Sequence, residues 1–283
     1  MSISRLRPLW AFPPMGATMS TSDSFAKRYQ SVLVPVIFEP WARELVARVG
    51  PRPGDHVLDL ACGTGAVTRE VAKQTPDVAK IVAADHSSGM LGVARSQSQG
   101  LSGDVDWIEA DAANLPFSEN RFDLAYCQQA LQFFPDRPKA LSELRRVLKP
   151  KAPVAFCVQR ELAVNPLLKA QAEALDAHVG KAAADAVRAI CSLPDREDLR
   201  ALFENAGFEG VQIESVTLML SHPDVQAFTR GALGGMHTGD KLSGLGNDQI
   251  ERAIEAFVAG LDPFVQNGAM LFPHTSHVVV ATA

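Results

Sequence analysis

The stretch VLDLACGTG, residues 57–65, decides the fold of this chain. Its apolar run contains one carboxylate, Asp59, and ends in a turn rich in glycine. The segment AVTREVAKQ at 66–74 follows with the spacing of an amphipathic helix. A buried strand that enters a helix through a glycine turn is typical of nucleotide-binding α/β domains. The stretch therefore predicts a ligand site at the carboxyl end of a first strand.

Strand and helix patterns alternate after this point. Short apolar runs bounded by turn residues predict strands at 55–61, 80–87, 105–112, 122–129 and 153–159. Strands that alternate with helical segments favour a parallel sheet covered by helices on both faces. Burial on both faces accounts for the nearly continuous apolar character of the runs. We therefore expect an α/β, Rossmann-like fold.

The rest of the chain suggests additions to this sheet. We expect a disordered leader at 1–22, because prolines interrupt its apolar residues and rule out a signal peptide. Lid helices are expected at 23–50, broken near Pro35 and Pro40. The domain that holds the ligand would cover 51–283. Helical cap insertions would interrupt it at about 161–193 and 222–268.

Composition narrows the function. The chain has 283 residues, 47% of them hydrophobic and 21% charged, with a formal net charge of −5. This balance is that of a globular protein and does not favour a nucleic-acid partner. We expect no membrane span, since no apolar run is long enough, and no metal, because cysteines and histidines lack ligand spacing. The four cysteines are expected to be reduced, as in the cytoplasm; the sequence sets no oligomeric state.

The glycine turn does not match the two common phosphate-binding motifs. No lysine follows Gly65, as a P-loop requires, and Thr68 stands where the dinucleotide motif needs a small residue. Asp59 would also repel a pyrophosphate. S-adenosylmethionine fits better, because its ammonium suits Asp59 and its carboxylate suits the backbone N–H groups near Gly63 and Gly65.

Acids and neighbours at the next strand ends suit the rest of that cofactor. Asp85 ends the second expected strand, where an acid can bind ribose hydroxyls; the alternative is a helix N-cap. Met90 can pack on the adenine or in the core. Asp111 can accept from the adenine amine while the Ala112 N–H donates to a ring nitrogen, unless Asp111 is only a solvated loop acid. Tyr29 lies on an N-terminal helix that can cover the methionine end.

Several segments together resemble the class I S-adenosylmethionine-dependent methyltransferases, and most closely their type-11, ubiquinone/menaquinone-biosynthesis-like group. These segments are VLDLACGTG, AADHSSGML, EADAANLPF, RFDLAYCQQALQFFPD and ALSELRRVLKP. The resemblance implies a seven-stranded sheet whose last strand, 270–282, is antiparallel. It also implies cofactor contacts at Asp59, Gly63, Gly65, Asp85, Met90, Asp111, Ala112 and Gln128.

The methyl acceptor is expected to be a small, fairly apolar molecule that offers an O, N, S or C nucleophile. The strand exit CQQALQFFPD lacks the Asx-Pro-Pro-aromatic element of amino-methylating enzymes, and Cys127 does not follow a proline as in base C5-methylating enzymes. Apolar residues of the cap, such as Leu168 and Phe228, can line a pocket or simply hold the helices together.

Catalytic residues are otherwise unassigned. In-line displacement from a sulfonium depends mainly on positioning, and a general base is needed only if the acceptor must lose a proton early. His274 and His237 are the candidates for such a base. Two other functions remain open: a protein that binds S-adenosylmethionine without methyl transfer, such as a cyclase, sensor or activating subunit, and an NAD(P)-dependent oxidoreductase, whose G-x-G-x-x-G and Tyr-x-x-x-Lys patterns are missing.

Overall fold

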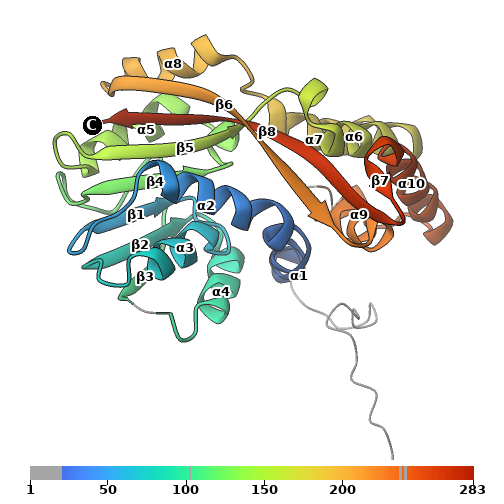
Figure 1. The fold of residues 1–283 in the computed structure, drawn as a ribbon, viewed down its shortest axis with the longest axis horizontal. Coiled ribbons are helices and arrows are strands. Elements are labelled where there is room, and N and C mark those ends of the chain that lie inside the picture. Colours follow the sequence, from blue (N-terminus) through green and yellow to red (C-terminus); the bar gives the residue numbers. More distant parts are fainter. Residues whose placement is uncertain (1–20, 102, 236–237, 239–240) are drawn as a thin grey trace, which may run out of the picture.

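A twisted, mostly parallel sheet organises the chain (Figure 1). The computed structural model describes residues 21–101, 103–235, 238 and 241–283, and within them eight strands form one sheet. The strands are β1 (His56–Leu60), β2 (Lys80–Asp85), β3 (Val105–Glu109), β4 (Leu124–Gln128), β5 (Pro153–Gln159), β6 (Glu209–His222), β7 (Val265–Gln266) and β8 (Ala269–Thr282). Their order is β3-β2-β1-β4-β5-β8-β6, with β7 paired to β8.

The strand pairing confirms the expected sheet. β1 to β5 pair in parallel, and β8 runs antiparallel to both β5 and β6. The order reverses between β1 and β4, which are neighbours although two strands separate them in sequence. A ligand crevice is expected at that reversal, outside the carboxyl ends of the strands. The two-residue strand β7 is an addition that the sequence patterns did not indicate.

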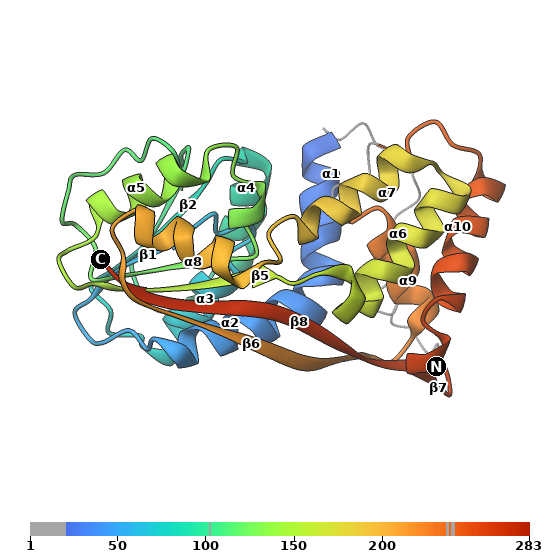
Figure 2. The ribbon, with the colours of Figure 1, turned by 90° about the horizontal axis from the view of Figure 1, so that it is seen from above.

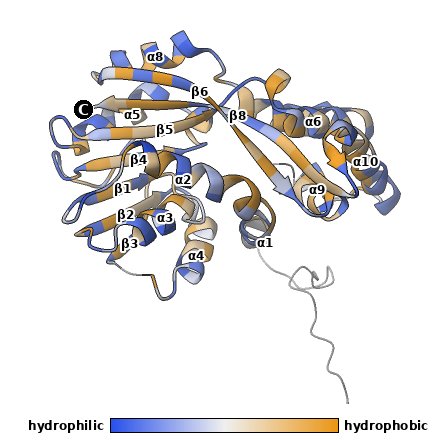
Figure 3. Ribbon diagram, viewed as in Figure 1, coloured by the Kyte–Doolittle hydropathy of each residue, from blue (hydrophilic) through white to orange (hydrophobic). Residues whose placement is uncertain are grey.

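Helices cover both faces of the sheet, as Figures 1 and 2 show. They include α3 (Ala66–Gln74), α4 (Ser88–Gln97), α5 (Arg137–Val147) and α8 (Arg196–Asn205). Successive residues of β1 enter different cores, because side chains alternate along a strand: Val57 packs in one and Leu58 in the other, both fully buried. Hydrophobic residues gather on the central strands and hydrophilic ones on the outer helices and loops (Figure 3).

The N-terminal helices form one uninterrupted helical run. α1 (Thr21–Arg28) continues into the π-helix η1 (Tyr29–Phe38) and then into α2 (Glu39–Arg48). The expected breaks near Pro35 and Pro40 were therefore wrong. Pro40 lies in the first turn of α2, where a missing N–H is tolerated. Around Pro35 the helix adopts π geometry, a local distortion that takes the place of a break.

The leader expected at 1–22 lies outside the described residues except for its last two positions, which begin α1. The stretches 161–193 and 222–268 contribute a group of helices beside the sheet (Figure 2). These cap helices are α6 (Pro166–His178), α7 (Lys181–Arg188), α9 (Val225–Leu233) and α10 (Asn247–Ala259), with short 3₁₀ turns at Leu162–Val164, Ala189–Cys191 and Asp262–Phe264. None of the helices built from described residues is long and apolar enough to cross a membrane.

A long two-stranded arm joins the sheet to this cap. β5 pairs with β8 only as far as Gln159 and Ser276, whereas β6 and β8 stay paired out to His222 and Met270. The outer half of the arm therefore leaves the sheet and runs under the cap helices (Figure 2). His274 lies on this outer half of β8, two residues from Ser276, the last residue of β8 that pairs with β5.

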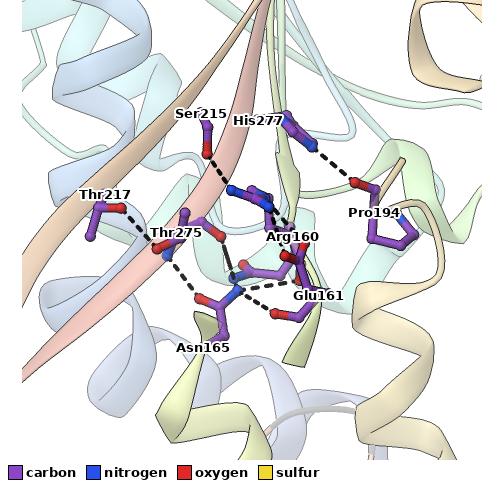
Figure 4. Close-up of polar contacts among 9 residues, drawn as sticks. Arg160, Glu161, Asn165, Pro194, Ser215, Thr217, Thr275 and His277 are labelled. Atoms are coloured by element: carbon purple, nitrogen blue, oxygen red, sulfur yellow. Dashed lines mark hydrogen bonds and ion pairs between the residues drawn. The ribbon is translucent and has the colours of Figure 1, made fainter. Parts of the chain in front are cut away.

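The Asn165 side chain forms hydrogen bonds with the backbone of β8 beyond the point where β5 ends. Its Oδ1 accepts from the Thr275 N–H at 2.8 Å, and its Nδ2 donates to the Thr275 carbonyl at 3.0 Å, so that the side chain imitates a paired strand (Figure 4). Around it, Arg160 forms an ion pair with Glu161 at 2.6 Å and donates to Ser215 Oγ at 2.8 Å. This network fixes the point at which the cap and the sheet meet.

Candidate active site and cofactor site

A cavity of about 860 Å³ opens at the carboxyl ends of β1 to β4, between the sheet and the cap. Its volume lies in the upper part of the range of small-molecule sites, roughly 300–1,000 Å³. Seven of the residues singled out in the sequence line it: Tyr29, Asp85, Met90, Asp111, Ala112, Gln128 and His274. The structure thus brings together residues that are up to 245 positions apart in the chain, because 274 minus 29 is 245.

The remaining candidates lie elsewhere. Asp59 and Gly63 line a second hollow of about 20 Å³ that adjoins the first and is covered by Tyr29 and Phe38. Gly65 lines neither cavity. His237 lies outside the described residues.

The glycine turn adopts backbone conformations that L-side chains rarely take. Gly63 has φ +56° and Gly65 has φ +83°, and a Cβ at Gly65 would lie 2.7 Å from Cη2 of Trp107. Both backbone N–H groups already have protein acceptors: Gly63 donates to Asp85 Oδ2 at 2.8 Å and Gly65 to the Cys62 carbonyl at 2.8 Å. In this conformation neither is free for a ligand carboxylate, contrary to the expectation from sequence.

Two groups near the turn, the guanidinium of Arg69 and the hydroxyl of Thr64, were not among the candidates predicted from the sequence. Arg69 Nη1 donates to the Thr64 carbonyl at 2.5 Å, while Arg69 Nη2 is buried without a hydrogen-bond partner. Thr64 Oγ1 is likewise buried and unpaired, and Thr64 lines the smaller hollow. Burial lowers the pKa of Arg69. The signal in the sequence was an arginine in the first turn of α3, where the helix dipole disfavours a positive charge.

Asp59 lies at the end of β1 against the first turn of α3. Its Oδ2 accepts from the Thr68 N–H at 3.0 Å and from the Thr68 hydroxyl at 2.6 Å. Burial raises the pKa of Asp59 to about 6, although both hydrogen bonds from Thr68 act in the opposite direction. The carboxyl is therefore bound to the protein on one oxygen and ionises only near neutral pH.

Asp85 joins the second strand to the glycine turn. Its Oδ2 accepts from Gly63 N–H, and its Oδ1 accepts from Ser87 N–H at 2.8 Å. The N-cap of α4 is Ser87, whose hydroxyl accepts from Met90 N–H at 3.3 Å, so the alternative in which Asp85 caps this helix does not apply. The carboxylate is 7% exposed and lines the large cavity. Each oxygen keeps a lone pair for a ligand hydroxyl.

The end of β3 forms a tight turn beside the same cavity. Asp111 Oδ1 accepts from Ala113 N–H at 2.9 Å. Asp111, Ala112 and Met90 all line the cavity, so an acceptor, a backbone group and an apolar side chain face one region. This combination fits the edge and face of a nucleobase.

The N-terminal helical run, α1 and η1, lines one side of the cavity with Phe25, Tyr29, Ile37 and Phe38. Gln128, at the end of β4, donates from Nε2 to the Phe38 carbonyl at 2.8 Å. The ring of Tyr29 lies 4.6 Å from that of Phe38 and 6.2 Å from that of Phe25, measured between centroids. Burial raises the pKa of Tyr29 well above its usual value. Tyr29 thus separates the small hollow from the large cavity.

The lining of the large cavity also includes Ile37, Leu168 and Ile190, four glutamines and His274. Trp41, fully buried in α2, donates from Nε1 to His274 Nδ1 at 2.8 Å. Burial lowers the pKa of His274 to about 3. No lysine or arginine occurs among the described residues that line the cavity. Of the apolar cap residues considered from sequence, Leu168 lines the cavity, whereas Phe228 and its neighbours Leu233 and Phe272 pack into the core.

This fold and site define a class I methyltransferase that uses S-adenosylmethionine. A model of the ubiE/COQ5 methyltransferase family matches residues 20–222, and the chain belongs to that family. Ubiquinone/menaquinone biosynthesis C-methyltransferases are similar over about 190 residues. The protein of Francisella tularensis is 30% identical, over 62% of this chain and 76% of the relative. The protein of Escherichia coli is 33% identical, over 62% of this chain and 75% of the relative.

Solved structures share the fold at lower identity. Phosphoethanolamine N-methyltransferase 2 of Haemonchus contortus, in complex with S-adenosyl-L-methionine, has a TM-score of 0.56 at 16% identity, covering 92% of this chain and 57% of its own. YcgJ of Bacillus subtilis has a TM-score of 0.55 at 18% identity, covering 86% and 98%. The [4+2]-cyclase SpnF has a TM-score of 0.53 at 21% sequence identity, and the match covers 86% of this chain and 80% of the cyclase. At these identities the likeness shows the fold alone.

The bound cofactor supplies a methyl group activated by a sulfonium. The chain's part is to hold that methyl group in line with the acceptor and to keep water away. The large cavity fits both tasks, because its lining combines the carboxylates Asp85 and Asp111 near the ends of β2 and β3 with apolar residues of the cap such as Leu168 and Ile190. The family membership excludes the oxidoreductase alternative.

Proposed function

We propose that this enzyme methylates a small, mostly apolar acceptor that binds at the cap end of the large cavity. The supporting observation is the lining of that end, which combines aliphatic and aromatic side chains with uncharged amides and no lysine or arginine among the described residues. Phosphate or carboxylate groups would lack a cationic partner there. The net charge of −5 likewise disfavours a nucleic-acid acceptor.

Carbon is the acceptor atom in the names of the similar enzymes. An electron-rich carbon suits an apolar cavity, since its attack on a methyl group needs alignment and dryness more than charged recognition. We propose carbon on these grounds. The family match ends at residue 222, so β8, which contributes His274 to the cavity, lies beyond it.

For the cofactor we propose that Asp85 binds the ribose hydroxyls, that Asp111 and the Ala112 N–H bind the adenine edge, and that Met90 packs on its face. Asp59 and Gly63 would lie at the methionine end, with Tyr29 and Gln128 over it. The small hollow there has a volume of about 20 Å³, and the methionine end would also extend into the adjoining large cavity past Tyr29. We also propose a cytoplasmic location, supported by four free cysteines.

Two measurements test the proposal. Calorimetric titration with S-adenosylhomocysteine should show one saturable site, and a nicotinamide dinucleotide should show none. Cell extract incubated with the enzyme and methyl-labelled S-adenosylmethionine should then yield a labelled small molecule that partitions into organic solvent. Label found only in protein or nucleic acid would refute the proposed acceptor class.

A further inference from the structure

We propose that His274 is a fixed hydrogen-bond donor to an oxygen atom of the methyl acceptor, and not a general base. The inference rests on the proposed function, because it concerns the acceptor end of the same cavity. It goes beyond the family resemblance, since His274 lies on β8, outside the matched residues 20–222. It also reverses the role expected from sequence.

The tautomer of His274 follows from its partner. An indole N–H can only donate, so Trp41 Nε1, 2.8 Å away, requires a lone pair on His274 Nδ1. A neutral imidazole carries one proton, which must then be on Nε2. Among the described residues, Nε2 has no hydrogen-bond partner, and His274 lines the large cavity. The ring therefore presents an N–H to the acceptor and has no free lone pair with which to take a proton.

The surroundings keep the ring neutral. His274 is 3% exposed, and burial alone lowers its pKa, with no charged group contributing. The titratable Asp and His residues that line the cavity besides His274, namely Asp85, His86, Asp111 and Asp136, belong to β2 and to the loops that follow β2, β3 and β4. A neutral histidine held in this way can polarise an oxygen of a substrate without transferring a proton, as an uncharged electrophile.

Two amides complete the polar set. Gln129 is 9% and Gln132 4% exposed, and each has a buried Oε1 without a partner. Gln129 Nε2 donates to Ser276 Oγ at 2.8 Å, and Ser276 is two residues from His274 on the same face of β8, about 7 Å along the strand. Gln132 Nε2 donates to the Gln129 carbonyl at 3.1 Å. The residues that line the cavity thus supply one donor and two unused acceptors, and each glutamine oxygen reaches a ligand by rotation of its side chain toward the cavity.

A hydroxyl group matches this set best, because it can accept from His274 Nε2 and can donate to a glutamine Oε1 that turns toward it. An ammonium can donate to the glutamines, but it has no lone pair for the imidazole N–H. A hydrocarbon satisfies neither and leaves buried polar groups unpaired, which costs affinity. The geometry therefore points to an uncharged acceptor that carries a hydroxyl group, and His274 selects for its oxygen.

Nitrogen-15 NMR of the full chain with S-adenosylhomocysteine bound tests the tautomer directly. We expect His274 to show a protonated Nε2 and a bare Nδ1, unchanged from pH 5.5 to 8. Trp41→Phe should mix the two tautomers, an effect that a purely structural role of Trp41 would not produce. An Nδ1–H ring or an imidazolium in the unmodified protein overturns the proposal.

Probe binding tests the selectivity. With S-adenosylhomocysteine saturating, 1-naphthol should bind about tenfold more tightly than naphthalene, the ratio for one net hydrogen bond. His274→Gln keeps an N–H near the position of Nε2 and should keep the preference, whereas His274→Phe should abolish it. His277→Gln, on the same strand but outside the cavity, is the matched control and should behave like the parent.

The outcomes separate the two proposals. No preference for 1-naphthol, or no saturable binding of it while S-adenosylhomocysteine binds normally, overturns the role of His274. A preference that is lost equally in His274→Gln and His274→Phe also overturns it. The glutamine amide can donate a hydrogen bond as the imidazole N–H does, so only a role other than donation would be lost in both variants. Failure of S-adenosylhomocysteine to bind the unmodified protein would instead refute the proposed function.

Discussion

Asp59 and Thr68 link β1 to the first turn of α3, because one carboxylate oxygen of Asp59 accepts both the backbone N–H and the hydroxyl of Thr68. This contact orients the glycine turn between them. It also keeps a buried carboxyl group where a cationic ligand is expected. Stability and ligand binding therefore make opposite demands on Asp59.

Asp59→Asn should stabilise the protein at pH 7.5. The pKa of Asp59 rises from 3.8 to about 6 on folding. The protonated carboxyl therefore favours the folded state relative to the ionised one. This contribution to the free energy of unfolding is full below about pH 4 and is lost as pH rises through 6. The loss approaches about 3 kcal/mol at neutral pH. Urea unfolding should show Asp59→Asn more stable than the parent by about 1–3 kcal/mol at pH 7.5, with a smaller difference at pH 4.5. A gap that widens toward acid would contradict this.

The same substitution should weaken the cofactor site. An uncharged amide no longer attracts an ammonium, so S-adenosylhomocysteine should bind at least tenfold less tightly to Asp59→Asn at pH 7.5. In the parent protein, affinity should rise between pH 5 and 7 as the carboxyl ionises. Calorimetry at several pH values measures both effects. A pH-independent affinity equal to that of the variant would remove Asp59 from the ammonium site.

Gly65→Ala should destabilise the fold and the turn. A Cβ at Gly65 would meet the Trp107 ring at 2.7 Å in a backbone with φ +83°. Gly54→Ala is a matched control, because Gly54 has φ +87° but nothing within 4 Å of a Cβ. The free energy of unfolding should fall by about 1 kcal/mol in the control because of backbone strain. In Gly65→Ala it should fall by about 2–4 kcal/mol, because overpacking against Trp107 adds to the strain. Equal losses in urea unfolding would show that the contact with Trp107 relaxes without cost.

Asp85→Ala should weaken binding of S-adenosylhomocysteine by about 10- to 100-fold, since the charge-assisted bonds to ribose hydroxyls would be lost. Asp85→Asn can still accept from Gly63 and should keep the turn but not the full affinity. Asp104→Asn, which removes a surface partner of Lys80, serves as the control for charge alone and should bind as the parent does. Calorimetry that finds Asp85→Ala unchanged would exclude Asp85 from the ribose site.

Asn165→Ala should loosen the junction between the sheet and the cap. The substitution leaves the Thr275 N–H buried without its acceptor, at a cost of about 1–3 kcal/mol. Thr217→Val removes only the hydroxyl contact with Thr275 Oγ1 and should cost less than about 1 kcal/mol. Urea unfolding compares the two variants. If Thr217→Val proves as costly as Asn165→Ala, the amide is not the contact that secures the junction.

Most of the fold was predictable because its signals are local. Short apolar runs separated by amphipathic helices identify a parallel sheet, and the strand-end acids follow each run directly, as Asp85 follows β2. The helical breaks were predicted wrongly at Pro35 and Pro40, because local propensity carries no information about the core against which η1 and α2 pack. Likewise β7 owes its existence to its partner β8 and has no pattern of its own.

The sequence by itself determined the sheet, the cofactor class and the candidates at the cofactor end, since each depends on residues close together in the chain. Tertiary structure alone decided which polar groups already have a partner within the protein, such as the N–H groups of the glycine turn and the Ser87 hydroxyl that caps α4. It also decided that Arg69 Nη2 is buried without a partner. It also decided the chemistry of His274. The tautomer of that ring depends on Trp41, 233 residues earlier, and only folding brings an indole N–H to one nitrogen and leaves the other facing the acceptor.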